Sequence, residues 1–348
     1  MRKIRVLLYG IGAVGAMIAK CLLEKEGVEI VGAIDIAEDK TGRDLGDVLG
    51  LERKLGVQVS ADADAVLSKA EADIAVLATS SYLKDTFPQI ASVVKHGVSI
   101  VSTCEELAYP YISNQKMAEQ LDALAKKHGA TILGTGINPG FLMDTLVLTL
   151  TAACTSVKKI EATRVLDAAN RRLPFQRKVG VGLTLDEFRR QIKEKRISGH
   201  VGLEQSIAMV AAGLAWKLDK ITAEPPEPVI AEKNVAGGSR KVEAGKVAGL
   251  KQRARGTMNG KDVIVLDFEA FVGAEEHDAV MIDGVPIVAE KIQPCVHGDV
   301  ATVAVVVNSI PRVLCAAAGL VTMKDLPVPH AALGDMRGHV TAQRLRQT

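Results

Sequence analysis

Short apolar runs alternate with amphipathic stretches through the first part of the chain. Five runs rich in Val, Ile and Leu predict strands, at Ile4–Tyr9, Glu29–Ile34, Ile74–Ala78, Val98–Val101 and Thr131–Leu133. Apolar residues spaced three and four apart predict helices between them, at Ala13–Glu26, Lys84–His96 and Gln115–His128. Strands that are apolar throughout and alternate with helices are typical of a parallel sheet covered on both faces. We therefore expect a doubly wound α/β fold.

The pattern changes after the segment "GTGINPGF" at 134–141. Helices are predicted at Leu142–Ala152, Thr184–Lys195 and Leu203–Trp216, and strands at 158–167, Val263–Phe271, Ala279–Ile282 and Ala301–Val307. This mixture indicates a second, α+β domain. We expect the domains to span 1–140 and 141–307, with a C-terminal segment, 308–348, that packs back on the first domain through an Ala-rich helix from Asn308 to about Leu320.

Length and composition agree with two ordinary globular domains. The chain has 348 residues, of which 48% are hydrophobic and 3% aromatic, and a formal net charge of +2. A chain this close to neutral, without a basic run, gives no sign of a nucleic-acid-binding surface, so we expect no nucleic-acid partner. We also find no apolar stretch near the roughly 20 residues of a membrane span. The basic and then apolar N-terminus continues into a glycine motif instead of a cleavage site, so it predicts a strand.

The cysteines and histidines give no sign of a disulfide framework or a metal site. Five cysteines are an odd number and none has CxxC spacing, which favours reduced thiols in the cytoplasm. The seven histidines are dispersed, without HxxxH or HExxH spacing, so we expect no metal.

The first predicted strand runs directly into "GIGAVG", in which Gly10, Gly12 and Gly15 surround Ala13 and Val14. In a dinucleotide site the first glycine permits a tight turn, the second lets the backbone approach a pyrophosphate, and the third allows close packing of helix and strand. The helix that follows offers N–H groups to the phosphates. Glycine clusters also form plain turns, but the strand before this one and the helix after it favour a Rossmann-type cofactor site.

Asp35 ends the second predicted strand, 20 residues after Gly15. A carboxylate there can accept hydrogen bonds from the adenosine ribose and repels a 2′-phosphate, which favours NAD. A solvated strand-end Asp is the alternative, and Lys40 and Arg43 nearby leave use of NADP open. Thr79, Ser80 and Ser81 close another strand and are predicted either to border the nicotinamide or only to cap the strand end.

Two further segments follow predicted strands and should face each other across the cofactor, because ligands bind beyond the carboxyl ends of parallel strands. The first contains Glu105 and Glu106, either of which could be a general base or an ordinary helix-start residue. The second contains Asn138, Pro139 and Phe141, which could contact the substrate, and Asn138 could instead bind the nicotinamide carboxamide. The alternative for the second segment is a structural turn, since Asn-Pro-Gly is strong turn chemistry.

Seven segments together resemble one enzyme family. They are "GIGAVG", "ATSS", "STCEELAYP", "LGTGINPGF", "SGHVG", "VNSIPRV" and "GLVTMKDLPVP", in order from Ile4 to Pro329. The chain resembles 2,4-diaminopentanoate dehydrogenase and its relatives, the native amine dehydrogenases. Its first domain is similar to that of dihydrodipicolinate reductase, but the paired-histidine motif with a following lysine is missing, which disfavours that activity.

The resemblance implies a homodimer that catalyses NAD(P)-dependent, reversible oxidative deamination of 2,4-diaminopentanoate or a related amine. The family's catalytic acid matches Glu105. A carboxylate suits the reaction because it stabilises the iminium cation, takes a proton from the ammonium group and activates water. A diamino acid also carries a carboxylate, for which Arg164 is the natural clamp. His200 is a second candidate contact, although an isolated His is more often structural.

Other interpretations stay open at this point. A sensor that binds NAD(H) without turnover would use the same fold, and a reductase of C=N or C=C bonds would act without releasing ammonia. Cys104 borders the predicted crevice, but thioester chemistry requires a partnered thiolate, so a packed strand-end thiol is the simpler explanation.

Overall fold

The computed structural model describes residues 2–171, 173–237 and 240–340. The chain divides into two compact units, and the first of them is discontinuous in sequence. It consists of Met1–Phe141 together with Gly298–Thr348, whereas the second is the continuous segment Leu142–His297. The chain therefore crosses between the units twice, after Phe141 and after His297.

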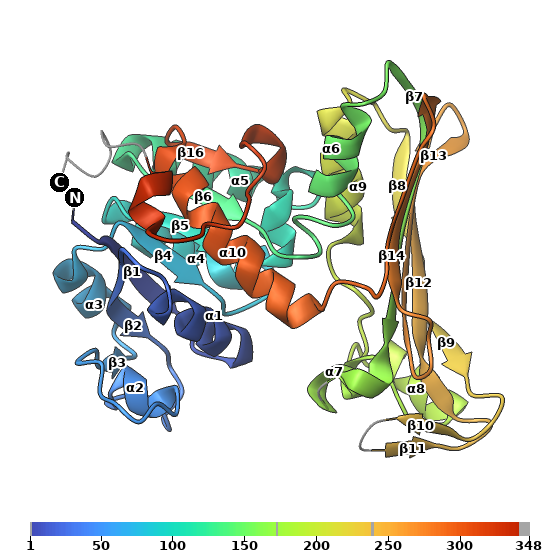
Figure 1. Ribbon diagram of the computed structural model, residues 1–348, viewed down its shortest axis with the longest axis horizontal. Coiled ribbons are helices and arrows are strands. Elements are labelled where there is room, and N and C mark those ends of the chain that lie inside the picture. The colour runs from blue at the N-terminus through green and yellow to red at the C-terminus, as the bar shows by residue number, and fades with distance from the viewer. Residues whose placement is uncertain (1, 172, 238–239, 341–348) are drawn as a thin grey trace. The chain divides into compact units, whose positions relative to one another are not determined.

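A seven-stranded sheet forms the centre of the first unit (Figure 1). Its strands are, in spatial order, β3 (Val59–Ser60), β2 (Val28–Ile34), β1 (Ile4–Tyr9), β4 (Ile74–Leu77), β5 (Ser99–Ser102), β6 (Thr131–Gly134) and β16 (Gly319–Val321). All six pairings between them are parallel. The order reverses between β1 and β4, which is the switch point of a doubly wound sheet. The predicted fold class is confirmed.

Helices connect these strands. They are α1 (Ala13–Leu23), α2 (Leu45–Val48), α3 (Ala63–Ala70), α4 (Leu83–Lys95), α5 (Gln115–His128) and α10 (Gly298–Cys315), with 3₁₀ turns η1 (Glu105–Ala108), η2 (Pro110–Ile112), η4 (Met323–Asp325) and η5 (Met336–His339). Helices α4 and α5 pack against each other and against β5 and β6, whereas α1 and α10 pack together and α10 also contacts β4, β5 and β6. The sequence analysis missed α2, α3 and β3, which are short.

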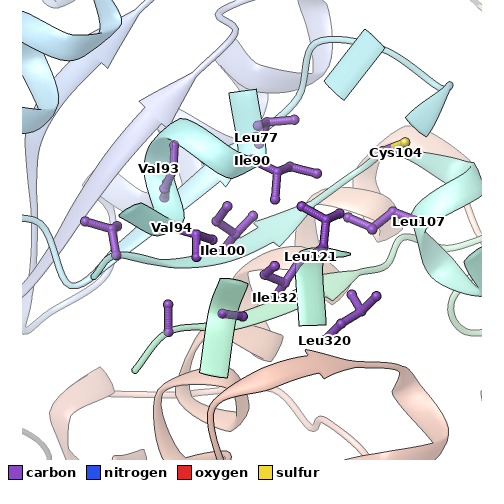
Figure 2. Packing of buried hydrophobic residues seen from close by; sticks show 14 of the residues in the cluster. Leu77, Ile90, Val93, Val94, Ile100, Cys104, Leu107, Leu121, Ile132 and Leu320 are labelled. Carbon is purple, nitrogen blue, oxygen red and sulfur yellow. The ribbon is translucent and has the colours of Figure 1, made fainter. Parts of the chain in front are cut away.

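A hydrophobic cluster fills the space between α4, α5 and the strands beside them (Figure 2). Buried side chains from β4, β5, β6 and β16 meet those of the helices there, as alternating strands and amphipathic helices predict. Cys104 and Leu107 also belong to this cluster, and both are almost completely buried. They lie on either side of Glu105 and Glu106 in the sequence, so the core fixes the segment that carries both acids.

Three sequence predictions for the C-terminal part of this unit differ from the structure. The segment Ala301–Val307, predicted as a strand, lies inside helix α10, and the expected domain boundary at residue 308 falls in the middle of that helix. The buried residues Val303, Val306, Ile310 and Val313 recur at three- and four-residue spacing, which is the helical period. Packing of this stripe on the sheet overrides the strand preference of the β-branched run. The predicted helix also ends earlier, since Gly319–Val321 forms strand β16.

Helix α10 is long and apolar enough to span a membrane by length and composition alone. It has 18 residues with a mean hydropathy of 1.4, a stretch that the sequence analysis did not single out. Half of these 18 residues are buried within the protein, as in the core helix of a globular domain.

The second unit is built on a mixed sheet. Its strands run in the order β15 (Val288–Ile292), β14 (His277–Val285), β7 (Ser156–Asp167), β13 (Lys261–Phe271), β12 (Val247–Met258) and β8 (Lys220–Ala223), and β9 (Glu227–Ile230) also pairs with β12. Only β7 and β13 are parallel neighbours among these strands. The remaining elements are α6 (Thr145–Thr151), η3 (Ala168–Asn170), α7 (Leu173–Lys178), α8 (Leu185–Lys193), α9 (Leu203–Gly213), β10 (Val235–Gly237) and β11 (Arg240–Val242). This is the predicted α+β architecture.

Candidate active site

The glycine loop between β1 and α1 has the geometry that a dinucleotide site requires. Gly10 has a φ of +90°, and a Cβ there would lie 2.6 Å from the carbonyl oxygen of Ala78. A Cβ on Gly15 would lie 2.0 Å from the carbonyl oxygen of Gly10, so neither position tolerates a side chain. At Gly12 a Cβ would meet no described atom within 4 Å. Protein packing therefore does not explain Gly12, whereas a pyrophosphate approaching the start of α1 does.

Asp35 ties the end of β2 to this loop. Its Oδ2 accepts hydrogen bonds from the Ile11 N–H at 2.7 Å and the Lys40 Nζ at 3.0 Å, and its Oδ1 accepts one from the Ala37 N–H at 2.9 Å. Burial acts to raise the pKa of Asp35, but these donors outweigh it and hold the pKa below its ordinary value. An ionised carboxylate has about four acceptor sites, so Oδ1 keeps capacity for a ribose hydroxyl.

The hydroxyl groups after β4 bind residues of α4. Thr79 Oγ1 donates to Gln89 Oε1 at 2.5 Å, and Ser80 Oγ donates to Asp85 Oδ2 at 2.8 Å. Ser80 Oγ also accepts the N–H of Tyr82, the residue before the helix, at 3.2 Å. These contacts agree with the strand-end cap that the sequence left open. A contact from Thr79, Ser80 or Ser81 to the nicotinamide stays a prediction.

The two acids after β5 lie in the 3₁₀ turn η1 and differ in their surroundings. The carboxylate of Glu106 accepts the Leu83 N–H at the start of α4 at 2.7 Å and the Asn114 Nδ2 at 3.2 Å. The backbone N–H of Glu106 donates to the Ser81 carbonyl at 3.2 Å. Glu106 is thus the helix-start residue of the pair. Both acids are partly exposed, and the acid–base role of Glu105 stays a prediction.

Cys104 is a packed thiol. It is 1% exposed, its Sγ donates to the Ser81 carbonyl at 3.3 Å, and it accepts from Thr86 Oγ1 at 3.5 Å. Burial raises the pKa of Cys104 to about 11. A thiol in this state is not a nucleophile at neutral pH, which argues against thioester chemistry.

The segment after β6 leaves the sheet at the same edge as η1, because β5 and β6 are parallel neighbours. The Thr135 N–H donates to the Ser102 carbonyl at 2.8 Å, and the Ile137 N–H donates to Thr302 Oγ1 on α10 at 3.4 Å. The bond between Asn138 and Pro139 is cis. Asn138 and Phe141 are partly exposed, whereas Pro139 is buried. The predicted contacts of these three residues with cofactor or substrate stay predictions.

One edge of the first sheet therefore collects most of the predicted residues. The glycine loop, Thr79–Ser81, η1 and Asn138–Phe141 follow β1, β4, β5 and β6, which are successive neighbours in a parallel sheet. Arg164 and His200 belong to the second unit.

Arg164 is held by a buried ion pair. The side chain is 2% exposed, its Nη1 donates to Asp278 Oδ1 at 2.8 Å, and its Nη2 donates to the Val296 carbonyl at 2.6 Å. Asp278 Oδ2 in turn accepts the Val296 N–H at 2.7 Å. The pair fixes the chain just before it crosses back to the first unit. The predicted carboxylate clamp thus has an intramolecular acid as partner, and a contact to substrate stays a prediction.

His200 stacks on Phe268, with ring centroids 4.5 Å apart and an interplanar angle of 15°. Its backbone N–H donates to Gln252 Oε1 at 2.8 Å. Burial lowers the pKa of His200 to about 3, with further lowering by Lys178 and Arg164, so the imidazole is neutral at physiological pH. A substrate contact for His200 also stays a prediction.

Sequence reasoning missed Asp278 and Gln252. Asp278 lies 114 residues from Arg164, and Gln252 lies 52 residues from His200, so no local pattern joins these pairs. For Glu106, the sequence left a helix-start role open, and the hydrogen bond from the Leu83 N–H agrees with that alternative.

A parallel sheet of this order, with a glycine loop at its switch point and an acid after β2, is typical of Rossmann-type dehydrogenases, which use a nicotinamide cofactor. The family model for the N-terminus of dihydrodipicolinate reductase matches residues 4–135. The model for the C-terminal domain of 2,4-diaminopentanoate dehydrogenase matches residues 141–342. The chain belongs to the 2,4-diaminopentanoate dehydrogenase family.

Relatives over nearly the full length support this assignment. The chain is 35% identical to 2,4-diaminopentanoate dehydrogenase of Acetoanaerobium sticklandii, over 99% of each chain. It is 22% identical to an amine dehydrogenase of Streptomyces virginiae, covering 93% of this chain and 96% of the relative. The solved amine dehydrogenase of Mycobacterium smegmatis superposes with a TM-score of 0.81 at 30% identity, covering 95% of this chain and 98% of the other. The protein is therefore an oxidoreductase, which sets the sensor interpretation aside.

Proposed function

We propose that the protein catalyses the reversible oxidative deamination of 2,4-diaminopentanoate, or a related small amine, to a ketone and ammonia, with Glu105 as acid and base. One observation carries this proposal. Glu105 lies at the carboxyl end of β5, on the sheet edge that also carries the glycine loop, while its neighbour Glu106 is bound to α4. The names of the relatives support the amine class of substrate.

NAD is the proposed cofactor. The N–H groups at the start of α1 would hold the pyrophosphate, and the ionised Asp35 would accept a ribose hydroxyl and repel a 2′-phosphate. When bound, the nicotinamide supplies the hydride acceptor for the amine carbon. The glycine loop leaves space for such a group beside Gly12, so the residues present fit it.

Glu105 would move the protons of the reaction. Its carboxylate takes a proton from the substrate ammonium, which frees the nitrogen lone pair to form the C=N bond as hydride leaves carbon. The acid releases this proton to solvent, and the carboxylate so restored stabilises the cationic C=N group. It then accepts a proton from the water that attacks the carbon of that group. The protonated acid gives this proton to the amino nitrogen, and its carboxylate then accepts the hydroxyl proton as the C=O bond forms and ammonia leaves. Release of that proton to solvent returns the acid to its starting state. Asn138 and Phe141, on the adjacent segment, are the proposed contacts for the substrate.

The test is Glu105→Gln, which keeps the shape of the side chain and removes the proton acceptor. With 2,4-diaminopentanoate and NAD, we expect the variant to lose about 10²- to 10⁴-fold in kcat while NAD affinity measured by titration is unchanged. Wild type should release one ammonia for each NADH formed, and the exposed acid Glu119 gives a matched control, Glu119→Gln, with wild-type turnover. Full turnover by Glu105→Gln would contradict the proposal, and NADH formation without ammonia would favour the C=N or C=C reductase.

Assembly as a homodimer is a further proposal from the family resemblance, and a cytoplasmic location is one from the odd number and spacing of the cysteines. Light scattering of the purified protein tests the first, and cell fractionation tests the second.

A further inference from the structure

We propose that Glu106 and Gly134 are positioning residues for Glu105: they brace the η1 turn between helix α4 and strand β6 and so fix the carboxylate that performs the chemistry. This inference rests on the role of Glu105 in the proposed function. It explains why two acids are adjacent where one suffices for the reaction.

The 3₁₀ geometry of η1 separates the directions of successive side chains. With three residues per turn, Glu105, Glu106 and Leu107 project about 120° apart. Leu107 is completely buried in the cluster of Figure 2, and Glu106 reaches the start of α4. Glu105 projects in the remaining one of these three directions. Any rotation of the turn that moves Glu106 or Leu107 therefore also moves Glu105.

Glu106 holds one side of the turn. Its carboxylate accepts the N–H of Leu83, the first residue of α4, at 2.7 Å, and the Asn114 Nδ2 at 3.2 Å. A negative charge at this helix end is further stabilised by the helix dipole. Its backbone N–H bonds the Ser81 carbonyl, in the loop predicted to border the nicotinamide. The brace thus joins the acid-bearing turn to the segment before α4.

Gly134 holds the other side. A Cβ at this position would lie 2.4 Å from the carbonyl carbon and 2.6 Å from the carbonyl oxygen of Leu107, and 2.7 Å from the nitrogen of Ala108. These are backbone atoms of η1, which cannot turn aside as a flexible side chain can. The turn therefore lies directly on β6, and only glycine permits that distance.

Removing the Glu106 carboxylate should displace Glu105 without removing it. We expect Glu106→Ala to lower kcat about 10- to 100-fold, since an error near 1 Å in the position of a catalytic group costs up to about 10²-fold. KM and NAD affinity should change much less. Glu106→Gln keeps an oxygen that can accept the Leu83 N–H, so it should restore most of kcat. A residue needed only for folding would lower the melting temperature without this selective loss.

The decisive measurement is a double-mutant cycle with Glu105→Gln. If Glu106 acts through Glu105, Glu106→Ala lowers the single-turnover rate of the wild-type background and has no further effect once Glu105 is Gln. Equal fold-losses in both backgrounds, or a lower melting temperature with unchanged kcat, would overturn the inference. Wild-type turnover by Glu105→Gln alone would instead overturn the proposed function and the inference with it, so the two failures are distinguishable.

Gly134→Ala tests the same brace from β6 and does not depend on how Glu106→Ala folds. It should show the same loss in kcat and the same lack of effect in the Glu105→Gln background. Gly338→Ala is the matched control, because a Cβ at Gly338 meets no described atom within 4 Å and should leave kcat unchanged. Equal kcat values for the two glycine variants would contradict the brace.

Discussion

At the scale of single residues, Asp35 and Lys40 form the contact that should decide the cofactor. Lys40 Nζ lies 3.0 Å from Asp35 Oδ2, with 22% of the Lys40 side chain and 10% of the Asp35 side chain exposed. The ammonium therefore lies beside the position where a 2′-phosphate would be bound, but its charge is matched by the carboxylate that repels the phosphate. The same pair would account for the proposed preference for NAD and for a latent capacity for NADP.

We expect Asp35→Ser to tighten NADP binding about 10- to 100-fold, the range of a charge-assisted hydrogen bond worth about 1.5–3 kcal/mol, and to weaken NAD binding. Titration calorimetry with each dinucleotide measures both changes without any substrate. Adding Lys40→Gln should remove the gain for NADP. Retention of that gain in the double variant would show that Lys40 does not bind the phosphate.

At the scale of elements, strand β7 carries one buried and one exposed ion pair. Arg164 and Asp278 join β7 to β14 with 2% and 6% of their side chains exposed. Lys159 and Glu161 on the same strand are 41% and 46% exposed. Because a buried charge left alone is costly and an exposed one is not, the two pairs should differ sharply in their effect on stability.

Arg164→Met should lower the free energy of unfolding by about 3–5 kcal/mol, whereas Lys159→Met should change it by about 0–1 kcal/mol. Thermal and denaturant unfolding without ligand measure both. Replacing both partners, as Arg164→Met with Asp278→Leu, should recover part of the loss. If Arg164→Met leaves stability intact and only raises KM for the amine, Arg164 is the substrate clamp that the sequence suggested.

Some helices and strands could be predicted from the sequence, and others could not. Up to residue 134 the sequence predicts the other strands and helices closely but not α2, α3 and β3, because continuous apolar strands and long amphipathic helices differ clearly in period. The helical structure of Ala301–Val307 could not be predicted, because a short β-branched run fits a strand and a buried helix equally well until its packing partner is known. The site divides in the same way. Loops at strand ends were predictable from parallel topology, whereas the Arg164–Asp278 pair depends on a contact across 114 residues of sequence.

At the scale of the whole molecule, the C-terminal segment completes the first unit. It supplies the edge strand β16 and the helix α10, whose Ile310 is fully buried while Val300 is 62% exposed. Ile310→Ala should lower the free energy of unfolding by about 2–5 kcal/mol, and Val300→Ala by less than about 0.5 kcal/mol. Thermal unfolding monitored through the loss of NAD binding measures the change in stability of this unit. Equal effects at the two positions would contradict the core assignment of α10.

The discontinuity of the first unit also sets an order for folding during synthesis. The ribosome makes Met1–Phe141 first, but the edge strand and the covering helix of that sheet emerge last. The whole of Leu142–His297, by contrast, has left the ribosome before either appears. The second unit can thus reach its final structure while Met1–Phe141 still exposes the apolar sheet face that α10 later covers. The sheet of the nucleotide-binding unit is therefore completed only after the entire second unit has been synthesised.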